Sequence, residues 1–114
     1  MELLIPGFAE PGCNNPQTQA QMNYCASQSA QESDKKLNQV YRKLQSSLNN
    51  TQQKRRLTNA QLSWLKFRDT HCAFEKGGYS GGSIAPTIYY SCLSDVTEQR
   101  IKQLQSDLDE FQKR

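Results

Sequence analysis

The sequence is poor in the residues that build a large hydrophobic core. Only 35% of its 114 residues are hydrophobic, 9% are aromatic, and there is a single tryptophan. Burial of apolar surface has to offset the conformational entropy lost on folding, so this composition leaves a small margin of stability. A chain of this length usually forms one domain. We therefore expect one small domain that is stabilised by something besides hydrophobic burial.

Long apolar runs and metal-ligand patterns are absent as well. No segment approaches the roughly 20 apolar residues that cross a bilayer, and Leu3-Leu4-Ile5 lacks the length and the basic flank of a signal peptide. We expect a soluble chain with no transmembrane segment, from which a targeting segment has been removed. The only histidine is His71, and no two cysteines have the close spacing of a zinc site. We expect no metal and no cofactor.

Four cysteines can supply the missing stability. Cys13, Cys25, Cys72 and Cys92 form an even set in a small polar chain, which is typical of a disulfide framework in an oxidising compartment. Each disulfide would add about 2–4 kcal/mol to the free energy of unfolding. Buried free thiols in a cytosolic protein are the alternative. We predict two disulfides. Proximity in sequence favours Cys13 with Cys25 and Cys72 with Cys92, although other pairings remain open.

The spacing of apolar residues predicts the first two helices. Thr18 and Gln21 have the form of a capping box, and apolar residues three and four positions apart continue to residues 49–50. Asn50 or Thr51 can begin a second helix that ends at residues 77–78. The apolar face of this second helix consists of Leu57, Ala60, Trp64, Phe67, His71 and Phe74.

A third helix is predicted after a glycine-rich segment. Residues 77–86 contain four glycines and predict a loop of about ten residues. Pro86 suits the first turn of the third helix, and a break near Ser94 is an alternative to one continuous helix. The pattern therefore predicts an all-α fold, a three-helix up-down-up bundle stapled by two disulfides, with the Gly-rich loop between helices 2 and 3. Residues 1–12 would be a flexible lead and residues 13–114 the single domain.

Several segments resemble the bacterial LprI-like family, one member of which is described as a lysozyme inhibitor. The resemblance covers the chain from Cys13 to about Leu108. It rests on Gln19-x-x-Met22-Asn23-x-Cys25-Ala26, Leu37-Asn38-x-x-Tyr41-x-x-Leu44, Ala60-Gln61-x-x-Trp64-x-x-Phe67-Arg68-Asp69-x-x-Cys72, Gly81-Gly82-Ser83 and Thr97-x-x-Arg100.

The resemblance implies a secreted or periplasmic binding protein that is not an enzyme and whose protein partner is lysozyme. A structural or interaction module of the bacterial envelope, with no lysozyme contact, is the alternative. The net charge of +3 weakens the first interpretation, because it gives no long-range attraction to a basic lysozyme. The oligomeric state stays open. We interpret these motif residues as structural: Met22, Asn23, Trp64, Arg68, Asp69, Thr97 and Arg100.

The Gly-rich loop is the candidate binding surface, and a featureless connector is the alternative. Tyrosines provide adaptable contact area, and the nearby disulfides would hold the ends of the loop in place. The predicted binding residues are Tyr79, Ser80, Gly81, Gly82, Ser83 and Tyr89.

Two other patterns are interpreted as non-functional. His71 beside Cys72 is not a base and nucleophile pair, because neighbouring helical residues point about 100° apart and we expect Cys72 to be in a disulfide. Lys54, Arg55 and Arg56 are interpreted as a solvated face, so no nucleic-acid binding is expected.

Overall fold

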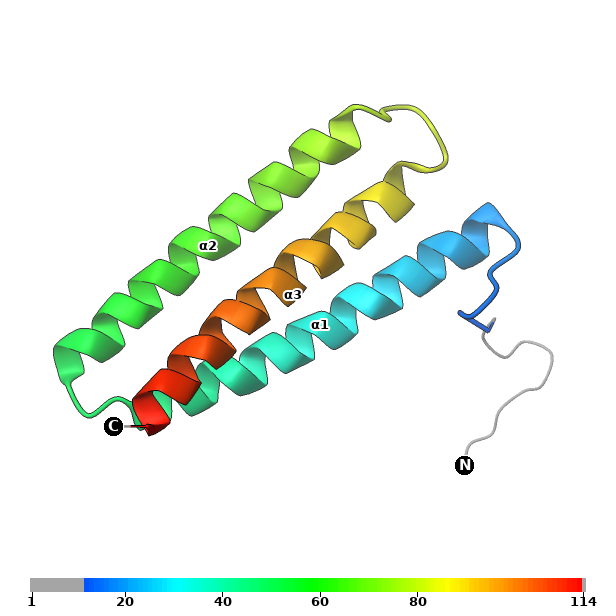
Figure 1. Cartoon of the computed structure of the whole chain (residues 1–114). Helices are drawn as coiled ribbons and strands as arrows, with labels where there is room; N and C mark the ends of the chain where they lie inside the picture. The colour runs from blue at the N-terminus through cyan, green and yellow to red at the C-terminus, as the bar shows by residue number, and fades with distance from the viewer. Residues whose placement is uncertain (1–11, 114) are drawn as a thin grey trace.

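The chain folds into three long helices that run up, down and up (Figure 1). The computed structural model describes residues 12–113, in which α1 spans Gln19–Ser47, α2 spans Thr51–Gly77 and α3 spans Ala85–Gln112. No strand occurs in this part of the chain. The predicted all-α bundle is confirmed. Apart from Gly12, the flexible lead predicted for residues 1–12 lies outside the described residues.

The helices begin where local capping signals predict. Thr18 Oγ1 accepts a hydrogen bond from the backbone N–H of Gln21 at 3.0 Å, and Oε1 of Gln21 accepts one from the backbone N–H of Thr18 at 3.2 Å. Asn50 caps α2 through its side chain alone, since its Oδ1 accepts from the backbone N–H of Gln53 at 3.0 Å, and Pro86 occupies the first turn of α3. Because α3 runs without interruption, the alternative of a break near Ser94 is wrong.

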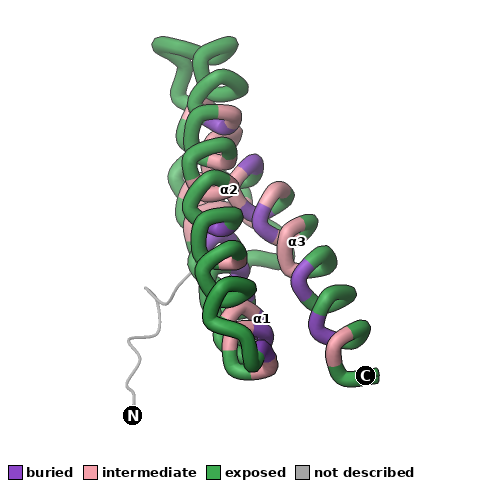
Figure 2. Tube along the Cα trace, turned by 90° about the vertical axis from the view of Figure 1, so that its left-hand side faces the viewer, coloured by how far each residue is buried: buried purple, intermediate pink, exposed green. Residues whose placement is uncertain are grey.

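The core lies between α1 and α3, and α2 contributes only to its edge. The buried members all come from α1 and α3, whose contact is the most extensive in the bundle. They are Leu37, Val40, Leu44, Leu104 and Leu108. Leu57 and Trp64 of α2 are only partly buried against this cluster. Figure 2 shows the same division, since most of α2 is exposed while α1 and α3 carry most of the buried segments.

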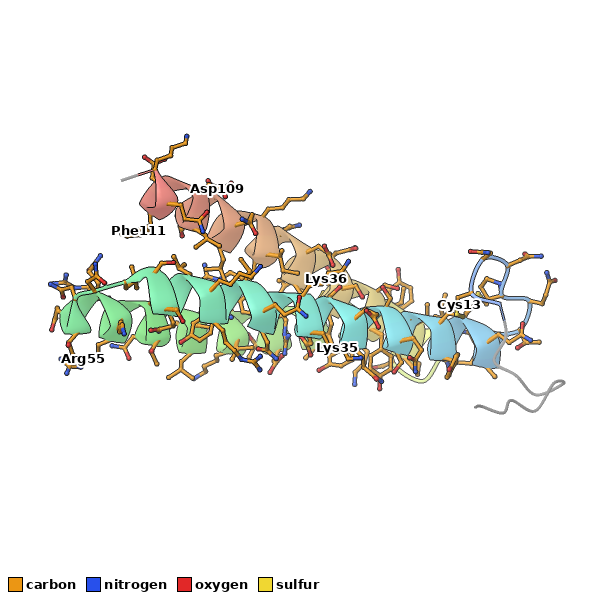
Figure 3. The ribbon with its side chains drawn as sticks, turned by 90° about the horizontal axis from the view of Figure 1, so that it is seen from below. Cys13, Lys35, Lys36, Arg55, Asp109 and Phe111 are labelled. Atoms are coloured by element: carbon orange, nitrogen blue, oxygen red, sulfur yellow. A yellow bond between two sulfur atoms is a disulfide. The ribbon has the colours of Figure 1, made fainter. Side chains whose placement is uncertain are left out.

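The bundle is thin and opens toward one end. Its extents are 51 × 40 × 18 Å. Viewed from below, the end of α3 near Asp109 and Phe111 stands apart from the ribbons of α1 and α2 (Figure 3). The Phe111 side chain nevertheless packs against the core cluster.

The rotation of α2 differs from the sequence prediction. Phe67 and Phe74 were expected on the buried face with Trp64, but they are 55% and 77% exposed. The buried residues of α2 are instead Gln61 and Cys72. The cause is that α2 is held by a disulfide and by polar contacts to α1 and α3, so its most apolar face does not determine which side turns inward.

Both disulfides form as predicted, and they lie at one end of the bundle. Cys13 pairs with Cys25 and Cys72 pairs with Cys92, with S–S distances of 2.05 and 2.12 Å. The start of α1, the end of α2 and the start of α3 share this end (Figure 1). We call the two disulfides together with residues 78–84 the disulfide pole.

None of the helices in the described part of the chain combines the length and the apolar character needed to cross a membrane.

Candidate functional site

The loop at the disulfide pole is shorter than predicted, and turns hold its backbone. It covers residues 78–84, because α2 includes Gly77 and α3 already begins at Ala85. Successive turns hold it: the N–H of Tyr79 donates to the carbonyl of Lys76 at 2.9 Å, and the N–H of Gly82 donates to the carbonyl of Tyr79 at 3.0 Å. Gly81 has a φ of 83°, which side chains other than glycine rarely adopt. The loop is therefore a defined structure joined to two helices.

The predicted binding residues lie on this loop and on the adjacent turn of α3. Tyr79 is 47% exposed, and Gly82 and Ser83 are also exposed. Ser80, Gly81 and Tyr89 line a pocket of about 480 Å³. The remaining residues that line this pocket are Lys76, Ala85, Pro86 and Tyr90.

A cation and two aromatic rings gather beside the loop. Lys76 Nζ lies 5.1 Å from the centre of the Tyr89 ring, within the range of a cation–π contact. The Tyr89 and Tyr90 rings meet edge to face at 5.7 Å. Together with exposed Tyr79, this surface offers aromatic area, one positive charge and backbone that is held in place by turns.

The motif residues Trp64, Arg68 and Arg100 form a cluster in the middle of the bundle. The guanidinium carbons of Arg68 and Arg100 lie 5.3 and 5.9 Å from the centre of a Trp64 ring. The Arg68 side chain is only 12% exposed, and its Nη1 donates to Asp34 Oδ1 of α1 at 2.9 Å and to Thr97 Oγ1 of α3 at 3.4 Å. Arg68 therefore joins all three helices.

Asp69 and Asn23, two further motif residues, also lie in polar contacts. Asp69 accepts a hydrogen bond from Nε of Arg68 at 2.9 Å. Asn23 Oδ1 accepts a hydrogen bond from Gln19 of the same helix and another from Thr87, and the second bond ties the start of α1 to the start of α3. Met22 is half-buried beside Asn23 in α1.

Arg100 is held by Gln61 across the interface of α2 and α3. Its Nε donates to Gln61 Oε1 at 2.9 Å. Burial lowers the pKa of the Arg100 guanidinium, and the nearby carboxylate of Asp107 opposes this change. This contact fixes the orientation of the Gln61 amide. An arginine can only donate, so the amide atom that faces Arg100 must be the oxygen.

Replacing Arg68 with methionine is expected to lower the free energy of unfolding by about 1–3 kcal/mol, because Thr97, 1% exposed, and Asp34 lose a charged donor. Arg68→Lys should recover only part of this loss, since an ammonium group cannot reproduce the planar set of donors. Urea unfolding followed by circular dichroism measures both. Arg55→Met is the control, because Arg55 is exposed and donates to Gln52 of its own helix. Equal stability of the Arg68→Met and Arg55→Met variants would contradict the structural role of Arg68.

A second cavity lies between α1 and α2, and we call it the α1–α2 groove. Its volume is about 350 Å³. It is lined by Asp34, Leu37, Asn38, Tyr41, Thr58, Gln61, Leu62, Leu65 and Arg68. The groove is not predicted from the sequence. Asn38, Tyr41 and Gln61 belong to the motif segments, but the sequence does not show that the rotation of α2 brings them together.

The described residues contain one potential metal-binding group, and its chemistry does not suit a metal. Ligand atoms of His71, Glu75 and Cys92 lie within 4.8 Å of one another. Because Cys92 is bonded to Cys72, it offers no thiolate. His71 Nε2 instead contacts Glu75 Oε2 at 3.1 Å. The same disulfide removes Cys72 as a nucleophile.

Comparisons with known proteins agree with the resemblance seen in the sequence. The family model described as "Lysozyme inhibitor LprI" matches residues 13–104. An uncharacterized protein of Rhizobium meliloti (strain 1021) is 28% identical over 107 residues, which cover 83% of this chain and 77% of that protein. No solved structure matches the chain significantly.

Proposed function

From the premise that this chain belongs to the family described as "Lysozyme inhibitor LprI", we propose that it is a non-enzymatic binding protein that inhibits a lysozyme. The observation that carries the proposal is the family match over residues 13–104, which includes both disulfides and the loop between α2 and α3. The two disulfides are typical of an oxidising compartment, so the proposed location is the periplasm or the exterior of a bacterial cell.

The disulfide pole is the proposed contact surface. Tyr79 is 47% exposed at the loop, and Phe74 and Ile84 on either side are 77% and 40% exposed. The disulfide between Cys72 and Cys92 joins the two helices that flank the loop. A surface that is already ordered loses less conformational entropy when it binds, which favours affinity.

Tyr79→Ala is the variant that tests this surface. We expect it to raise the concentration needed for half-maximal inhibition of a hen-type lysozyme by about tenfold, since exposed tyrosines are frequent binding hot spots. The measurement is the rate at which turbidity falls in a suspension of bacterial cells. The midpoint of thermal unfolding should stay almost unchanged, because Tyr79 packs little against the core.

Phe67→Ala is the matched control, because Phe67 is an aromatic residue that is 55% exposed and lies on α2 about three helical turns before the loop. This control variant should inhibit as well as the parent protein. If the parent protein inhibits and Tyr79→Ala inhibits equally well, the loop is not the contact surface. If the parent protein does not slow lysis at all, the proposal that it inhibits this lysozyme is wrong.

A second candidate function is an interaction module of the bacterial envelope with no lysozyme contact. The net charge of +3 favours it, because like charge gives no steering toward a basic lysozyme. The turbidity measurement separates the two functions, since only an inhibitor slows lysis.

A further inference from the structure

The amide of Gln61 is buried with its donors unused. Gln61 is 8% exposed, and its Oε1 accepts the hydrogen bond from Arg100 at 2.9 Å. The amide nitrogen Nε2 therefore lies on the other side of the group, and neither of its N–H bonds has an acceptor among residues 12–113. A buried donor without a partner is costly, and a ligand or a water molecule can supply the missing acceptor. Gln61 lines the α1–α2 groove, which is open to such a molecule.

The wall of the groove beside this amide is apolar. Leu62 and Leu65 line it, and Leu62 is 61% exposed. An exposed leucine beside a buried, unused amide donor offers contact to a ligand group that carries both a carbonyl oxygen and an alkyl substituent.

The wall formed by α1 is polar. Asp34 Oδ1 accepts from Arg68 at 2.9 Å, so the carboxylate is held in a fixed direction while its other oxygen remains an available acceptor. Asn38 lies one helical turn further on and presents an exposed amide. Such planar polar groups are suited to hydroxyl groups, each of which can donate and accept.

We propose that the α1–α2 groove binds the acetamido group of an N-acetylated amino sugar. The acetamido carbonyl accepts from Nε2 of Gln61, and its methyl group packs against Leu62 and Leu65. Hydroxyl groups of the sugar ring donate to Asp34 and to the side-chain oxygen of Asn38. The volume of about 350 Å³ is at the lower end for small-molecule pockets, which suits one or two sugar rings.

A peptide fits the groove less well. Strand addition needs a sheet edge, and residues 12–113 contain no strand. A bound amphipathic helix needs a groove that is mainly apolar, and a polyproline segment needs several aromatic side chains. Of the groove residues only Tyr41 is aromatic, and six of the nine are polar or charged, Tyr41 among them.

The groove and the disulfide pole are separate surfaces. The groove uses the middle of α1 and α2, whereas the loop follows the end of α2. Polymers of N-acetylated amino sugars are the substrates of lysozymes, so the groove would hold the protein on the material that it protects. The sugar site does not require lysozyme contact, and its test contains no lysozyme. The sugar-site proposal and the inhibitor proposal can therefore fail independently.

The test is a titration of isotope-labelled protein with the trimer of N-acetylglucosamine, followed by NMR. The side-chain amide signals of Gln61 report directly on the proposed hydrogen bond. The trimer of glucose with the same linkage is the control ligand, because it differs only in carrying a hydroxyl group in place of each acetamido group. We expect the first trimer to shift the Gln61 amide and Leu62 methyl signals at millimolar concentrations and the second to leave them almost unchanged.

Gln61→Glu is the most informative variant. It keeps an oxygen for Arg100 and removes both N–H donors, so the fold should survive while affinity for the trimer falls about tenfold or more. Leu62→Ala should weaken binding by about twofold to fivefold through loss of apolar contact. Phe74→Ala is the matched control, because Phe74 is an exposed apolar residue of α2 outside the groove.

The outcomes are distinct. Shifts at Gln61 and Leu62 that Gln61→Glu weakens support the proposal. Equal shifts with the glucose trimer overturn the role of the acetamido group. Shifts at Gln61 with an N-acetylated dipeptide but not with the sugar favour a peptide and overturn the sugar. An absence of shifts with every ligand means that the groove holds water only, which also overturns the proposal.

Discussion

Leu104→Ala is expected to lower the free energy of unfolding by about 2–5 kcal/mol, the usual cost of truncating a fully buried leucine. Leu104 is 1% exposed and lies in the cluster that α1 and α3 form together. The chain has few other apolar residues to fill the space, since only 35% of its residues are hydrophobic. The midpoint of thermal unfolding should fall by roughly 10–20 °C, as measured by calorimetry.

Leu62→Ala is the matched control for this variant. Leu62 is 61% exposed on α2, so its truncation should change the free energy of unfolding by less than about 0.5 kcal/mol. The two variants test whether the core lies between α1 and α3. They make the same substitution once in that interface and once on α2. Comparable destabilisation by the two substitutions would show that α2 contributes to the core as much as α3 does.

Most of the fold follows from local signals in the sequence. Thr18 with Gln21, Asn50 and Pro86 mark helix starts through interactions with their own chain neighbours, which makes them readable without the tertiary structure. The cysteines could also be paired correctly, because the helix lengths place all of them at one end and proximity in sequence favours the observed pairs.

The rotation of α2 could not be predicted from the pattern of apolar residues. Leu57, Trp64, Phe67 and Phe74 define the most hydrophobic side of this helix, yet Phe67 and Phe74 are mostly exposed. Which side turns inward depends on partners distant in sequence, such as Asp34 for Arg68 and Arg100 for Gln61. No periodicity within one helix contains that information.

The candidate sites show the same difference between local and distant information. The loop was found because glycine and tyrosine residues follow one another in the sequence. The α1–α2 groove was missed because Asn38 and Gln61 come from different helices, and the donors of Gln61 are unused only in the context of Arg100.

Removing the disulfide between Cys72 and Cys92 is expected to loosen α2 more than any other element. Cys72 is completely buried, and the Cys72–Cys92 bond spans 20 residues, so Cys72→Ala with Cys92→Ala should lower the free energy of unfolding by about 3 kcal/mol. The contact of α2 with α3 is smaller than that of α1 with α3, and the described residues show few contacts between α1 and α2. Amide hydrogens of α2 should therefore exchange faster than those of α1 and α3.

The double variant Cys13→Ala with Cys25→Ala is the matched comparison, because it separates a general loss of stability from a local loosening of α2. That disulfide spans 12 residues, a loop long enough for a similar entropic contribution. It ties only the segment before α1 to the first turns of α1, so its loss should leave hydrogen exchange in α2 unchanged. Uniform acceleration in all three helices after loss of the Cys72–Cys92 bond would contradict this account. Such a result would mean that α2 unfolds only together with the core, and that its polar contacts to Asp34 and Arg100 suffice to hold it.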